Sequence, residues 1–450
     1  MVIYKKNDIR GNTQIDLTPE RMVNIGKLIA YQMDYPDLVA VGMDPRKESV
    51  SLKNALISGL TSQGVNVADM GLVTTPATYF AAASDPEVQG AMMITASHNP
   101  LGTSGLKVSN YKGEAFHYDN FFRFIQENEE KDLSLPLKYG GTVSYDKGKE
   151  ILNRYLQLLY SKLDSINVKF GIEFGSGSTV IFKEVLKKKQ AHFIGLRPIP
   201  NPKFPGLLPD PAKKECYNDL SKLVVSLELD FGLAFDADGD RFGVADDKGR
   251  RIPPDKVTMI LGTEAIKNSD NKLVLIDVKT SLAVKKYLEK QGAKVSYTKV
   301  GHSWVHQTLL KTGAVFAGEL SGHYYFAGDY FGFDDALFSA VKFMNFVENL
   351  ESPLSEYVDS LPNYYSTPEI RTHLDKEKIS EVIEKAKDLA MNLGAELITI
   401  DGVRAELDDG WFLIRASGTE AAISYRVEGI NKEKFEELKK IITEKLGLKF

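Results

Sequence analysis

The stretch Gly90-Ala91-Met92-Met93-Ile94-Thr95-Ala96-Ser97-His98-Asn99-Pro100 joins an apolar segment to a short polar loop. The five residues before Thr95 predict a buried strand, and Pro100 marks the end of the loop behind it. In an open α/β sheet, ligands bind at the carboxyl ends of the strands. The loop therefore places one hydroxyl nucleophile, Ser97, and a neighbouring imidazole, His98, where a ligand site is expected. By itself the Ser-His pair is equally typical of a surface or capping position.

Strand and helix patterns alternate on the amino-terminal side of this loop. A short apolar run at residues 38–44 predicts a strand, and leucine and isoleucine at helical spacing over 49–64 predict a helix. A second strand over 65–71 and a helix over 78–83 complete a βαβαβ pattern, for which a parallel sheet is expected.

The alternation restarts twice before the pattern changes. Strands of the second and third sections are predicted at residues 168–174, 231–235, 242–245, 273–278, 294–300 and 314–318. From about residue 364 the chain instead carries a helix over 376–393, several strands before residue 429 and an amphipathic helix over 432–446. Three α/β units followed by one α+β unit are therefore predicted. The expected domains are residues 1–145, 146–247, 248–362 and 363–450.

Composition excludes several classes of protein. The net charge of −5 over 450 residues argues against a partner such as nucleic acid or an anionic membrane, which would require a basic surface. The single cysteine, Cys216, excludes a disulfide framework within the chain and suits a reducing compartment. Charges in Met1–Asp8 do not fit a signal peptide, and no run of about 18 apolar residues is present. A cytoplasmic protein is expected.

Three carboxylates at alternate positions, Asp236, Asp238 and Asp240, lie in a loop between two apolar strands. Their oxygens can converge on one hard cation, and Gly239 permits a sharp turn. An EF-hand does not fit, because its sixth position, here Arg241, must be glycine and its flanks must be helices. The alternative is a solvated acidic hairpin tip, although three such carboxylates without a cation repel one another. With positions left open for a phosphate oxygen, Mg²⁺ is the expected occupant.

Two further polar loops follow predicted strands. Glu319, Ser321 and His323 alternate along an expected extended loop, which suits hydroxyl recognition and proton transfer, although an ordinary polar turn explains them as well. The run Arg415-Ala416-Ser417-Gly418-Thr419-Glu420 offers a guanidinium, two hydroxyls and the N–H groups around a glycine, a set that suits an anion. Residues 102–107 lack the Gly-Lys-Ser/Thr ending of a Walker A loop, so a bound phosphate is expected at residues 415–419.

These four loops, one in each section and in this order, closely resemble the motifs of the α-D-phosphohexomutase superfamily, in particular its phosphomannomutase/phosphoglucomutase type. The resemblance covers essentially the whole chain. Shorter matches support it: Asp8-Ile9-Arg10-Gly11, Gly42-Met43-Asp44-Pro45-Arg46, Gly105-Leu106-Lys107 and Thr298-Lys299-Val300-Gly301-His302. It implies three tandem mixed α/β-sheet domains and a C-terminal α+β domain around a central cleft.

The resemblance also implies roles for the residues of the first two loops. Ser97 matches a phosphoserine that donates and re-accepts a phosphoryl group, with His98 beside it. Together with Ser97, the implied ligands of Mg²⁺ are Asp236, Asp238 and Asp240. Arg241 matches a phosphate contact.

Residues elsewhere match positions around the sugar. Those that hold its hydroxyls are Glu319 and Ser321, and the clamp for the phosphate that does not react consists of Arg415, Ser417, Gly418 and Thr419. Cationic or acid/base positions around the reacting hydroxyl are matched by Arg10, Lys107, Lys279, His302 and His323. Removal of the hydroxyl proton requires a base, for which His323 is the first choice and Lys107 the second.

The implied activity is that of an isomerase, the reversible interconversion of hexose 1-phosphate and hexose 6-phosphate through phosphoserine and a 1,6-bisphosphate. Mg²⁺ is the implied cofactor, hexose 1,6-bisphosphate the activator and a phosphosugar the partner. The chain is expected to act as a monomer or homodimer.

Leu320 favours mannose and glucose phosphates, because this position is often methionine in those mutases and glutamine in phosphoglucosamine mutases. The sequence Ser417-Gly418-Thr419 is instead frequent in phosphoglucosamine mutases, so this activity stays an alternative. A catalytically silent phosphosugar-binding paralogue is a further alternative. The chain departs from the family pattern at Asn7, Thr103-Ser104 and Ala421, and no charged catalytic group is lost there.

Overall fold

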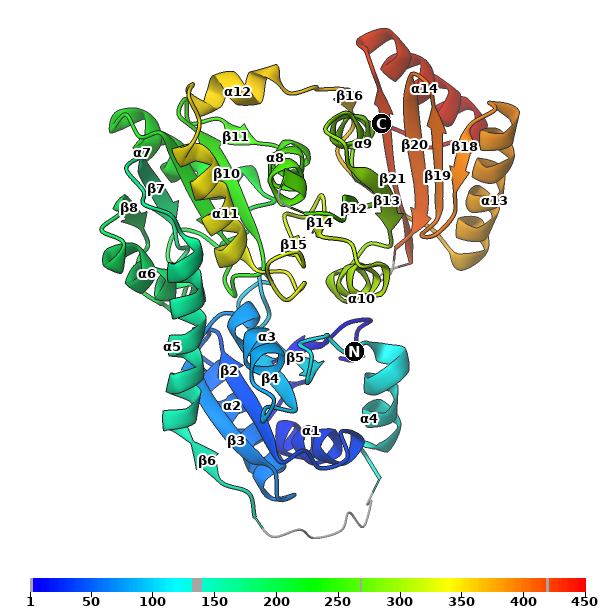
Figure 1. Cartoon of the computed structure of the whole chain (residues 1–450). Helices are drawn as coiled ribbons and strands as arrows, with labels where there is room; N and C mark the ends of the chain where they lie inside the picture. The colour runs from blue at the N-terminus through cyan, green and yellow to red at the C-terminus, as the bar shows by residue number, and fades with distance from the viewer. Residues whose placement is uncertain (1–2, 132–139, 268, 418–420) are drawn as a thin grey trace. The chain divides into compact units, whose positions relative to one another are not determined.

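The computed structural model describes residues 3–131, 140–267, 269–417 and 421–450. The chain forms two compact units. Unit 1 comprises Met1–Ile252 with Ser321–Glu356, and unit 2 comprises Pro253–Leu320 with Tyr357–Phe450. The architecture is the expected four-domain α/β fold, with sheets in succession along the chain (Figure 1).

The first sheet of unit 1 has the strand order β1-β5-β4-β2-β3-β6. Its strands are β1 (Ile9–Asn12), β2 (Leu38–Met43), β3 (Asn66–Leu72), β4 (Gly90–Ile94), β5 (Thr103–Asn110) and β6 (Val143–Ser144). Its helices are α1 (Pro19–Gln32), α2 (Ser49–Thr61), α3 (Thr75–Ser84) and α4 (Arg123–Asn128). The predicted buried strand before Ser97 is confirmed as β4, whose five residues are all buried.

The parallel arrangement expected for the three strands of the βαβαβ pattern is confirmed, and the sheet as a whole is mixed, because a further strand at one side was not predicted. Strands β2, β3 and β4 are parallel, but β5 runs antiparallel to both β4 and β1. The chain after the Ser97 loop therefore turns straight back along β4 instead of crossing over through a helix. This hairpin-like return brings Lys107 of β5 opposite Met93 of β4, close to the end of the strand that carries Ser97.

The second sheet of unit 1 has the order β11-β10-β9-β7-β8. Its strands are β7 (Lys169–Glu173), β8 (His192–Leu196), β9 (Phe231–Phe235), β10 (Phe242–Asp246) and β11 (Arg251–Ile252). The helices that follow its strands are α6 (Phe182–Lys188) and α7 (Asn218–Ser226). Unit 1 also contains β15 (Tyr324–Phe326) and α11 (Ala336–Glu348).

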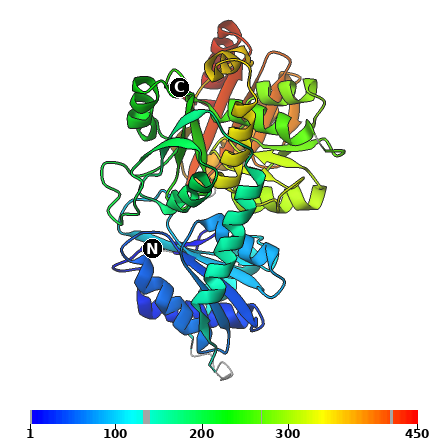
Figure 2. The same cartoon turned by 60° about the vertical axis from the view of Figure 1, so that its left-hand side comes forward.

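Helix α5 (Tyr145–Lys162) joins the two sheets of unit 1. It contacts β3 of the first sheet, α6 beside the second sheet, and α11. In both cartoon views it extends from beside the first sheet to the second (Figures 1 and 2). Tyr155, in the middle of α5, is fully buried and donates its hydroxyl to the carboxylate of Asp335, which caps α11. The two sheets and α11 are thereby fixed relative to one another.

Unit 2 begins with three parallel strands in the order β13-β12-β14. These strands are β12 (Leu273–Asp277), β13 (Lys294–Thr298) and β14 (Phe316–Gly318). They alternate with α8 (Pro254–Lys267), α9 (Leu282–Lys290) and α10 (His302–Thr312). Helix α12 (Leu354–Ser360) then leads into the last sheet.

The last sheet of unit 2 has the order β16-β21-β20-β19-β18, and β17 also pairs with β21. Its strands are β16 (Tyr365–Ser366), β17 (Ile370–His373), β18 (Glu396–Ile398), β19 (Val403–Leu407), β20 (Gly410–Ala416) and β21 (Ala422–Gly429). Two amphipathic helices, α13 (Lys376–Asn392) and α14 (Lys432–Leu446), cover one face (Figure 1). The predicted α+β unit and its C-terminal helix are confirmed.

Alternation along β20 separates the two faces of this sheet. Phe412 and Ile414 pack under α13 and α14, whereas Trp411 and Leu413 pack against Val278 and Leu282 of the first half of unit 2. On this second face the buried guanidinium of Arg404 lies 3.7 Å from the centre of the Trp411 ring. It also donates to the carbonyl oxygens of Val278 and Thr280, both at 2.8 Å. Hydrogen bonds of the buried Arg404 therefore stabilise the packing on this second face, in addition to the burial of apolar side chains.

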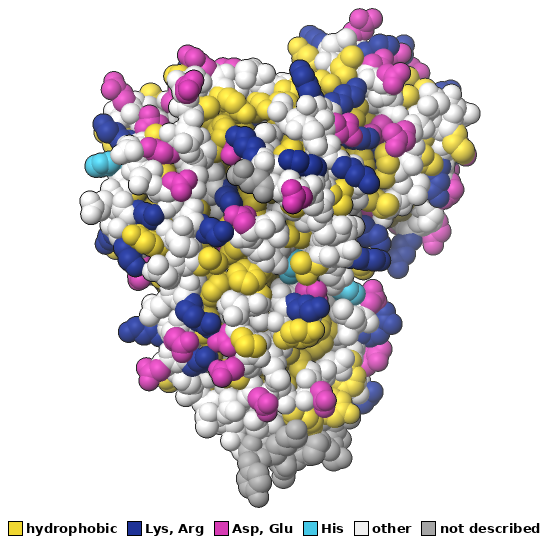
Figure 3. All heavy atoms as spheres, viewed as in Figure 1, with side chains coloured by type: hydrophobic (Ala, Val, Ile, Leu, Met, Phe, Trp, Pro, Cys, Tyr) yellow, Lys and Arg dark blue, Asp and Glu magenta, His cyan; other side chains and the backbone are white. Residues whose placement is uncertain are grey.

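On the face drawn in Figure 3, acidic and basic side chains are interspersed over the surface. Among the residues described, no helix combines the length and the apolar character needed to cross a membrane.

Candidate active site

Ser97 lies directly beyond the end of β4 and is almost completely buried. Its φ angle is +51°, in the left-handed region that a residue with a Cβ adopts only under constraint. The constraint is local: the Ser97 N–H donates to the Thr95 hydroxyl at 2.9 Å, and that hydroxyl donates to Asp44 at 2.9 Å. The strained turn thus carries the hydroxyl of Ser97 just beyond the end of β4.

Arg46 stabilises the loop that carries Ser97. Its guanidinium is buried and donates to four backbone carbonyls around the turn, those of Ser97 (2.7 Å), Asn99 (2.6 Å), Pro100 (3.2 Å) and Thr103 (3.4 Å). Asp44 balances its charge, with 3.1 Å between the Arg46 Nε and a carboxylate oxygen. Arg46 is therefore a positioning residue for Ser97.

The Arg46→Ala variant is expected to reduce kcat by about tenfold to a hundredfold, with little change in the binding of substrate. Up to four carbonyl contacts are lost, and about 1–3 kcal/mol attaches to each buried group left unsatisfied. An Arg46→Lys variant, which keeps the charge but not the fork of donors, should recover only part of the rate. Steady-state kinetics measures both. A fall in kcat/KM caused only by a higher KM would contradict a positioning role.

The loop between β9 and β10 carries the three aspartates, as the spacing predicts. One carboxylate oxygen of Asp236 accepts the N–H groups of Gly239 (2.9 Å), Asp240 (3.2 Å) and Arg241 (3.3 Å). Gly239 has φ +74°, and a Cβ there would lie 2.7 Å from a methyl group of Thr74. The second oxygen of Asp236 accepts the hydroxyl of Ser97 at 2.9 Å. Residues separated by 139 positions are thus brought into direct contact.

Lys107 faces the other two aspartates of this loop. Its ammonium lies 2.9 Å from Asp238 and 2.6 Å from Asp240, and all three side chains are buried. Burial disfavours their charged forms, but the ammonium holds the pKa of Asp238 below and that of Asp240 well below the ordinary value. The two carboxylates in turn raise the pKa of Lys107 well above its ordinary value, against its own burial. Burial and its two acidic neighbours instead raise the pKa of Asp236 well above the usual range.

The aspartate loop fits a divalent cation. Asp236, Asp238 and Asp240 can each direct an oxygen to within 4.8 Å of the others. One buried oxygen of Asp238 and one of Asp240 have no hydrogen-bond partner among the described residues, a state that is unfavourable without a cation. Carboxylate oxygens alone are the donors that Mg²⁺ and Ca²⁺ prefer over softer metals. The residues present therefore suit a hard metal ion.

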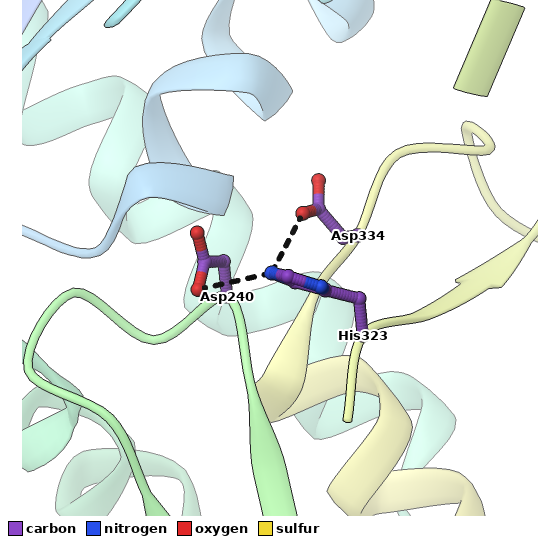
Figure 4. A group of neighbouring side chains, drawn as sticks. All are labelled: Asp240, His323 and Asp334. Atoms are coloured by element: carbon purple, nitrogen blue, oxygen red, sulfur yellow. Dashed lines mark ion pairs between the residues drawn. The ribbon is translucent and has the colours of Figure 1, made fainter. Parts of the chain in front are cut away.

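His323 joins this loop from the turn that follows β14 (Figure 4). Its Nε2 lies 3.6 Å from Asp240 and 3.8 Å from Asp334, and it accepts a hydrogen bond from Arg241 Nε at 3.0 Å. Its Nδ1 lies 2.8 Å from the Ser321 hydroxyl. Because Nε2 accepts from a guanidinium, the proton of the neutral ring is on Nδ1. This tautomer leaves Nε2 as the basic atom beside the aspartates.

The segment that carries Ser321 and His323 differs from the extended loop expected. It is a tight turn with Gly322 at φ +88°, and its Gly322 carbonyl accepts the N–H of Phe242 at 3.2 Å. This backbone bond, at the start of β10, is what places Ser321 and His323 beside the aspartate loop.

His98 lies beside Ser97, and the charge of Arg10 acts on the His98 ring. The His98 Nδ1 lies 3.0 Å from the Ser97 hydroxyl, and burial together with the charges of Arg241 and Arg10 lowers the pKa of His98 to about 2. Arg10, on β1, pairs with Asp8 at 2.8 Å. The imidazole of His98 is therefore neutral, and the charges of two arginines act on it.

In unit 2, a carboxylate of Glu319 accepts the N–H of Gly301 at 2.9 Å, which ties the end of β14 to the start of α10, where His302 lies. Lys279 follows β12, and its ammonium lies 3.4 Å from Glu369. These residues gather at the carboxyl ends of the parallel strands, the edge at which ligands are expected.

Arg415 lies at the end of β20 and is buried, with its guanidinium 3.1 Å from Asp401. The N–H of Ser417 donates to the Ala422 carbonyl at 2.8 Å, which closes the turn between β20 and β21. Gly418 and Thr419 of the predicted clamp lie outside the described residues.

Sequence reasoning missed three residues that complete the site. Thr75, at the start of α3, donates its hydroxyl to Asp238 at 2.7 Å and its N–H to the Asp238 carbonyl at 2.8 Å. Asp334 lies beside His323, and Arg46 holds the serine loop. Arg46 belonged to a motif already noted, but no pattern in the sequence links Thr75 or Asp334 to partners so distant along the chain.

Comparisons with known proteins agree with this geometry. Four family models match in order, described as phosphoglucomutase/phosphomannomutase alpha/beta/alpha domain I (residues 1–129), domain II (149–249), domain III (253–365) and the C-terminal domain (369–445). The chain belongs to the phosphoglucomutase/phosphomannomutase family. The expected resemblance is confirmed, and the protein is a phosphohexomutase enzyme.

Relatives and solved structures cover nearly the whole chain of this phosphohexomutase. A "phosphomannomutase/phosphoglucomutase" of Pseudomonas putida is 31% identical over 99% of this chain and 95% of its own. A "probable phosphoglucosamine mutase" of Methanosarcina acetivorans is also 31% identical, over 99% of this chain and 100% of its own. The crystal structure of a phosphoglucomutase/phosphomannomutase family protein from Burkholderia thailandensis matches with a TM-score of 0.90 at 28% identity, over 98% of this chain and 97% of that one.

Proposed function

We propose that this phosphohexomutase interconverts the 1-phosphates and 6-phosphates of mannose and glucose, with Ser97 as the phosphoryl carrier. One observation carries the assignment: the Ser97 hydroxyl lies 2.9 Å from Asp236 in a buried set of three aspartates. A phosphoserine bears about −1.5 to −2 charges at neutral pH, so it needs cations on this side. The aspartate loop, Lys107 and Arg241 are the groups positioned to supply or hold that positive charge.

In the first step, a sugar hydroxyl attacks the phosphorus of phosphoserine 97. The new bond joins the sugar oxygen to phosphorus, the bond from phosphorus to the Ser97 Oγ breaks, and the hydroxyl proton passes to a base. Transfer from the other end of the bisphosphate back to Ser97 then releases the isomeric monophosphate. Because one serine serves both ends, the bisphosphate must turn end for end between the steps.

Mg²⁺ is the proposed metal, held by Asp236, Asp238 and Asp240 together with the phosphate of Ser97. When bound, it neutralises charge on the transferring phosphoryl group, and catalysis of this transfer is mainly positioning and charge stabilisation. Arg241 is proposed to contact the same phosphate. Ser97 and the metal ligands are drawn from both sheets of unit 1, which α5 and α11 hold together.

His323 is the proposed base, because its Nε2 lies beside Asp240 and accepts a hydrogen bond from Arg241. Lys107 is the second choice, but two ion pairs favour its protonated form and hence a role as a fixed charge. Arg10 and His98 are proposed to surround the phosphate of Ser97.

The remaining predicted residues are assigned to the sugar and its distal phosphate. Glu319 and Ser321 are proposed to bind the sugar hydroxyls, with Lys279 and His302 as further contacts. The distal phosphate is assigned to the clamp made of Arg415, Ser417, Gly418 and Thr419.

Three further assignments accompany this function. Hexose 1,6-bisphosphate is the proposed activator, since it can restore phosphoserine 97 when a bisphosphate escapes. A cytoplasmic monomer or homodimer is proposed, since a chain with one cysteine suits a reducing compartment. We propose domain boundaries between residues 145 and 146, between 247 and 248, and between 362 and 363.

Phosphoglucosamine mutase is the second candidate, because the Methanosarcina acetivorans relative carries that name at the same identity as the Pseudomonas putida relative. The test is to compare kcat/KM for mannose, glucose and glucosamine 1-phosphates in one assay. We expect the two neutral sugars to react faster. A clear preference for glucosamine 1-phosphate would transfer the assignment to the second candidate, and no turnover of any of them would indicate a silent paralogue.

The Arg415→Ala variant is expected to lose about tenfold to a hundredfold in kcat/KM in both directions of the reaction. A hydrogen bond to a charged group contributes about 1.5–3 kcal/mol, and a guanidinium can form two to one phosphate. Either end of the reoriented bisphosphate should meet the same clamp, so both monophosphate substrates should be affected. Initial rates in each direction measure this effect, and a loss confined to one direction would mean that separate sites hold the two phosphates.

A further inference from the structure

One carboxylate, Glu369, lies among cations next to Arg415 of the proposed phosphate clamp. It directly precedes β17, and its oxygens accept the Ser424 hydroxyl at 2.6 Å and lie 3.4 Å from the Lys279 ammonium and 3.8 Å from the Arg371 guanidinium. Its side chain is only 20% exposed. The donors around it are those that a phosphate group would also require.

Strand pairing brings these donors to the same part of the sheet as Arg415. Ser424 of β21 is paired with Arg415 on β20 and with Arg371 on β17. Directly paired residues of antiparallel strands project on the same face, so Arg371, Ser424 and Arg415 form a row across three strands. Glu369 lies over this row.

The guanidinium of Arg415 can bind a further anion. Its side chain is about nine-tenths buried, yet among the described residues its Nε has no hydrogen-bond partner. Its guanidinium forms an ion pair with Asp401, which also accepts the N–H of Val300 at 3.0 Å. Asp401 therefore holds the guanidinium in place, whereas Glu369 contacts side chains within the described part of the chain that could bind a phosphate instead.

The charge of Glu369 is maintained in this position. Although burial opposes ionisation, the charge of Lys279, the hydrogen bond from Ser424 and the charges of Arg371 and Arg415 lower the pKa of Glu369 below its ordinary value. At neutral pH the clamp thus contains a fixed negative charge next to the site proposed for a dianionic phosphate.

We propose that Glu369 is an internal competitor of the distal phosphate: its carboxylate occupies Lys279, Ser424 and Arg371 in the free enzyme and must give up these contacts, or share them, when a phosphosugar binds. The inference rests on the proposed function of the clamp. It assigns Glu369 the role of weakening the hold on the phosphate, which favours release of the bisphosphate for its turn between the two transfers. Arg371 becomes a further contact for the phosphate once the carboxylate withdraws.

The test measures how tightly inorganic phosphate and glucose 6-phosphate bind to the full chain. Binding is measured by titration calorimetry without divalent metal. Glu369→Gln keeps the shape of the side chain and an oxygen for Ser424 but removes the charge. Because like charges side by side oppose binding, this variant should bind both ligands about tenfold more tightly. Its KM should fall without a rise in kcat. Glu369→Asp, which keeps the charge, should bind more nearly like the original protein.

A matched control is Glu381→Gln, which changes the net charge equally at an exposed position of α13. Weaker or unchanged binding by Glu369→Gln, with the control unchanged, would overturn the inference, because a carboxylate that merely holds the cations in place would be needed for binding. Arg415→Ala distinguishes failure of the clamp assignment from failure of the competitor role. If this variant leaves phosphate binding unaffected, the clamp assignment itself fails. If it weakens binding while Glu369→Gln does not strengthen it, only the competitor role fails.

Discussion

The Ser97→Ala variant is expected to lose mutase turnover by about a thousandfold or more while it still binds phosphosugars. The hydroxyl is the one nucleophile that the strained turn after β4 presents to the aspartate loop, with 2.9 Å to Asp236. Removing a covalent nucleophile removes the whole two-step route, so a large loss is the normal result. Binding should survive, because Arg415 of the proposed clamp and the proposed sugar contact Lys279 belong to unit 2.

The measurement is a coupled assay with saturating hexose 1,6-bisphosphate and metal, together with calorimetric binding of glucose 6-phosphate. Ser109→Ala is a suitable control, because Ser109 is a buried serine of β5 whose hydroxyl makes a long contact, 3.4 Å, to a backbone carbonyl. Near-normal turnover by Ser97→Ala under these conditions would contradict the phosphoserine assignment.

The second large effect is expected from loss of the metal. Treatment with a chelator, and the Asp238→Asn variant, should each reduce turnover by about a hundredfold or more, because the metal contributes several kcal/mol to stabilisation of the transition state. Asp238 is the most informative position: one of its oxygens pairs with Lys107 and Thr75, and the other is buried without a hydrogen-bond partner among the described residues.

Readdition of Mg²⁺ should restore the chelator-treated protein but only partly restore Asp238→Asn at higher concentrations. Asp164→Asn, an exposed change in the same unit, is the control, and thermal unfolding of each variant shows whether the fold is kept. If the metal-free protein keeps its full rate, the aspartate loop is only a turn.

The parts of this site that sequence predicts are those that are short and local. An apolar run followed by a polar loop identifies the end of β4, and alternation of three aspartates around Gly239 identifies a turn whose carboxylates converge. Both signals depend on neighbouring residues, so they need no knowledge of the rest of the fold.

The parts that sequence did not predict depend on pairing over long distances. Strand β5 contains glycine, serine, lysine and asparagine, so it lacks an apolar pattern, yet it is buried between β1 and β4 and delivers Lys107 to the aspartates. Thr75 meets Asp238 only because the start of α3 lies against the loop of the second sheet. Helix α1 differs from these cases, because the Thr18 cap followed by Pro19 is a local signal that predicts its start.

Glu369 illustrates the same limit in unit 2. In the sequence it is an acid beside a proline, and only the pairing of β17 and β20 with β21 brings it among Lys279, Arg371 and Ser424. The motif at the end of β20 predicts what that loop can bind. The group that competes with the ligand, Glu369, belongs to a different part of the sheet and is not part of the motif.

The most direct test of the phosphoserine mechanism is to locate a transferred phosphate. The protein is incubated with hexose 1,6-bisphosphate labelled with ³²P, freed of ligand, and digested for peptide mass spectrometry, before and after a chase with unlabelled glucose 1-phosphate. The mechanism predicts a single phosphate on Ser97, absent from Ser97→Ala, which the chase transfers into bisphosphate and glucose 6-phosphate. A label on another residue, or one that stays on Ser97 while the enzyme turns over, would contradict it.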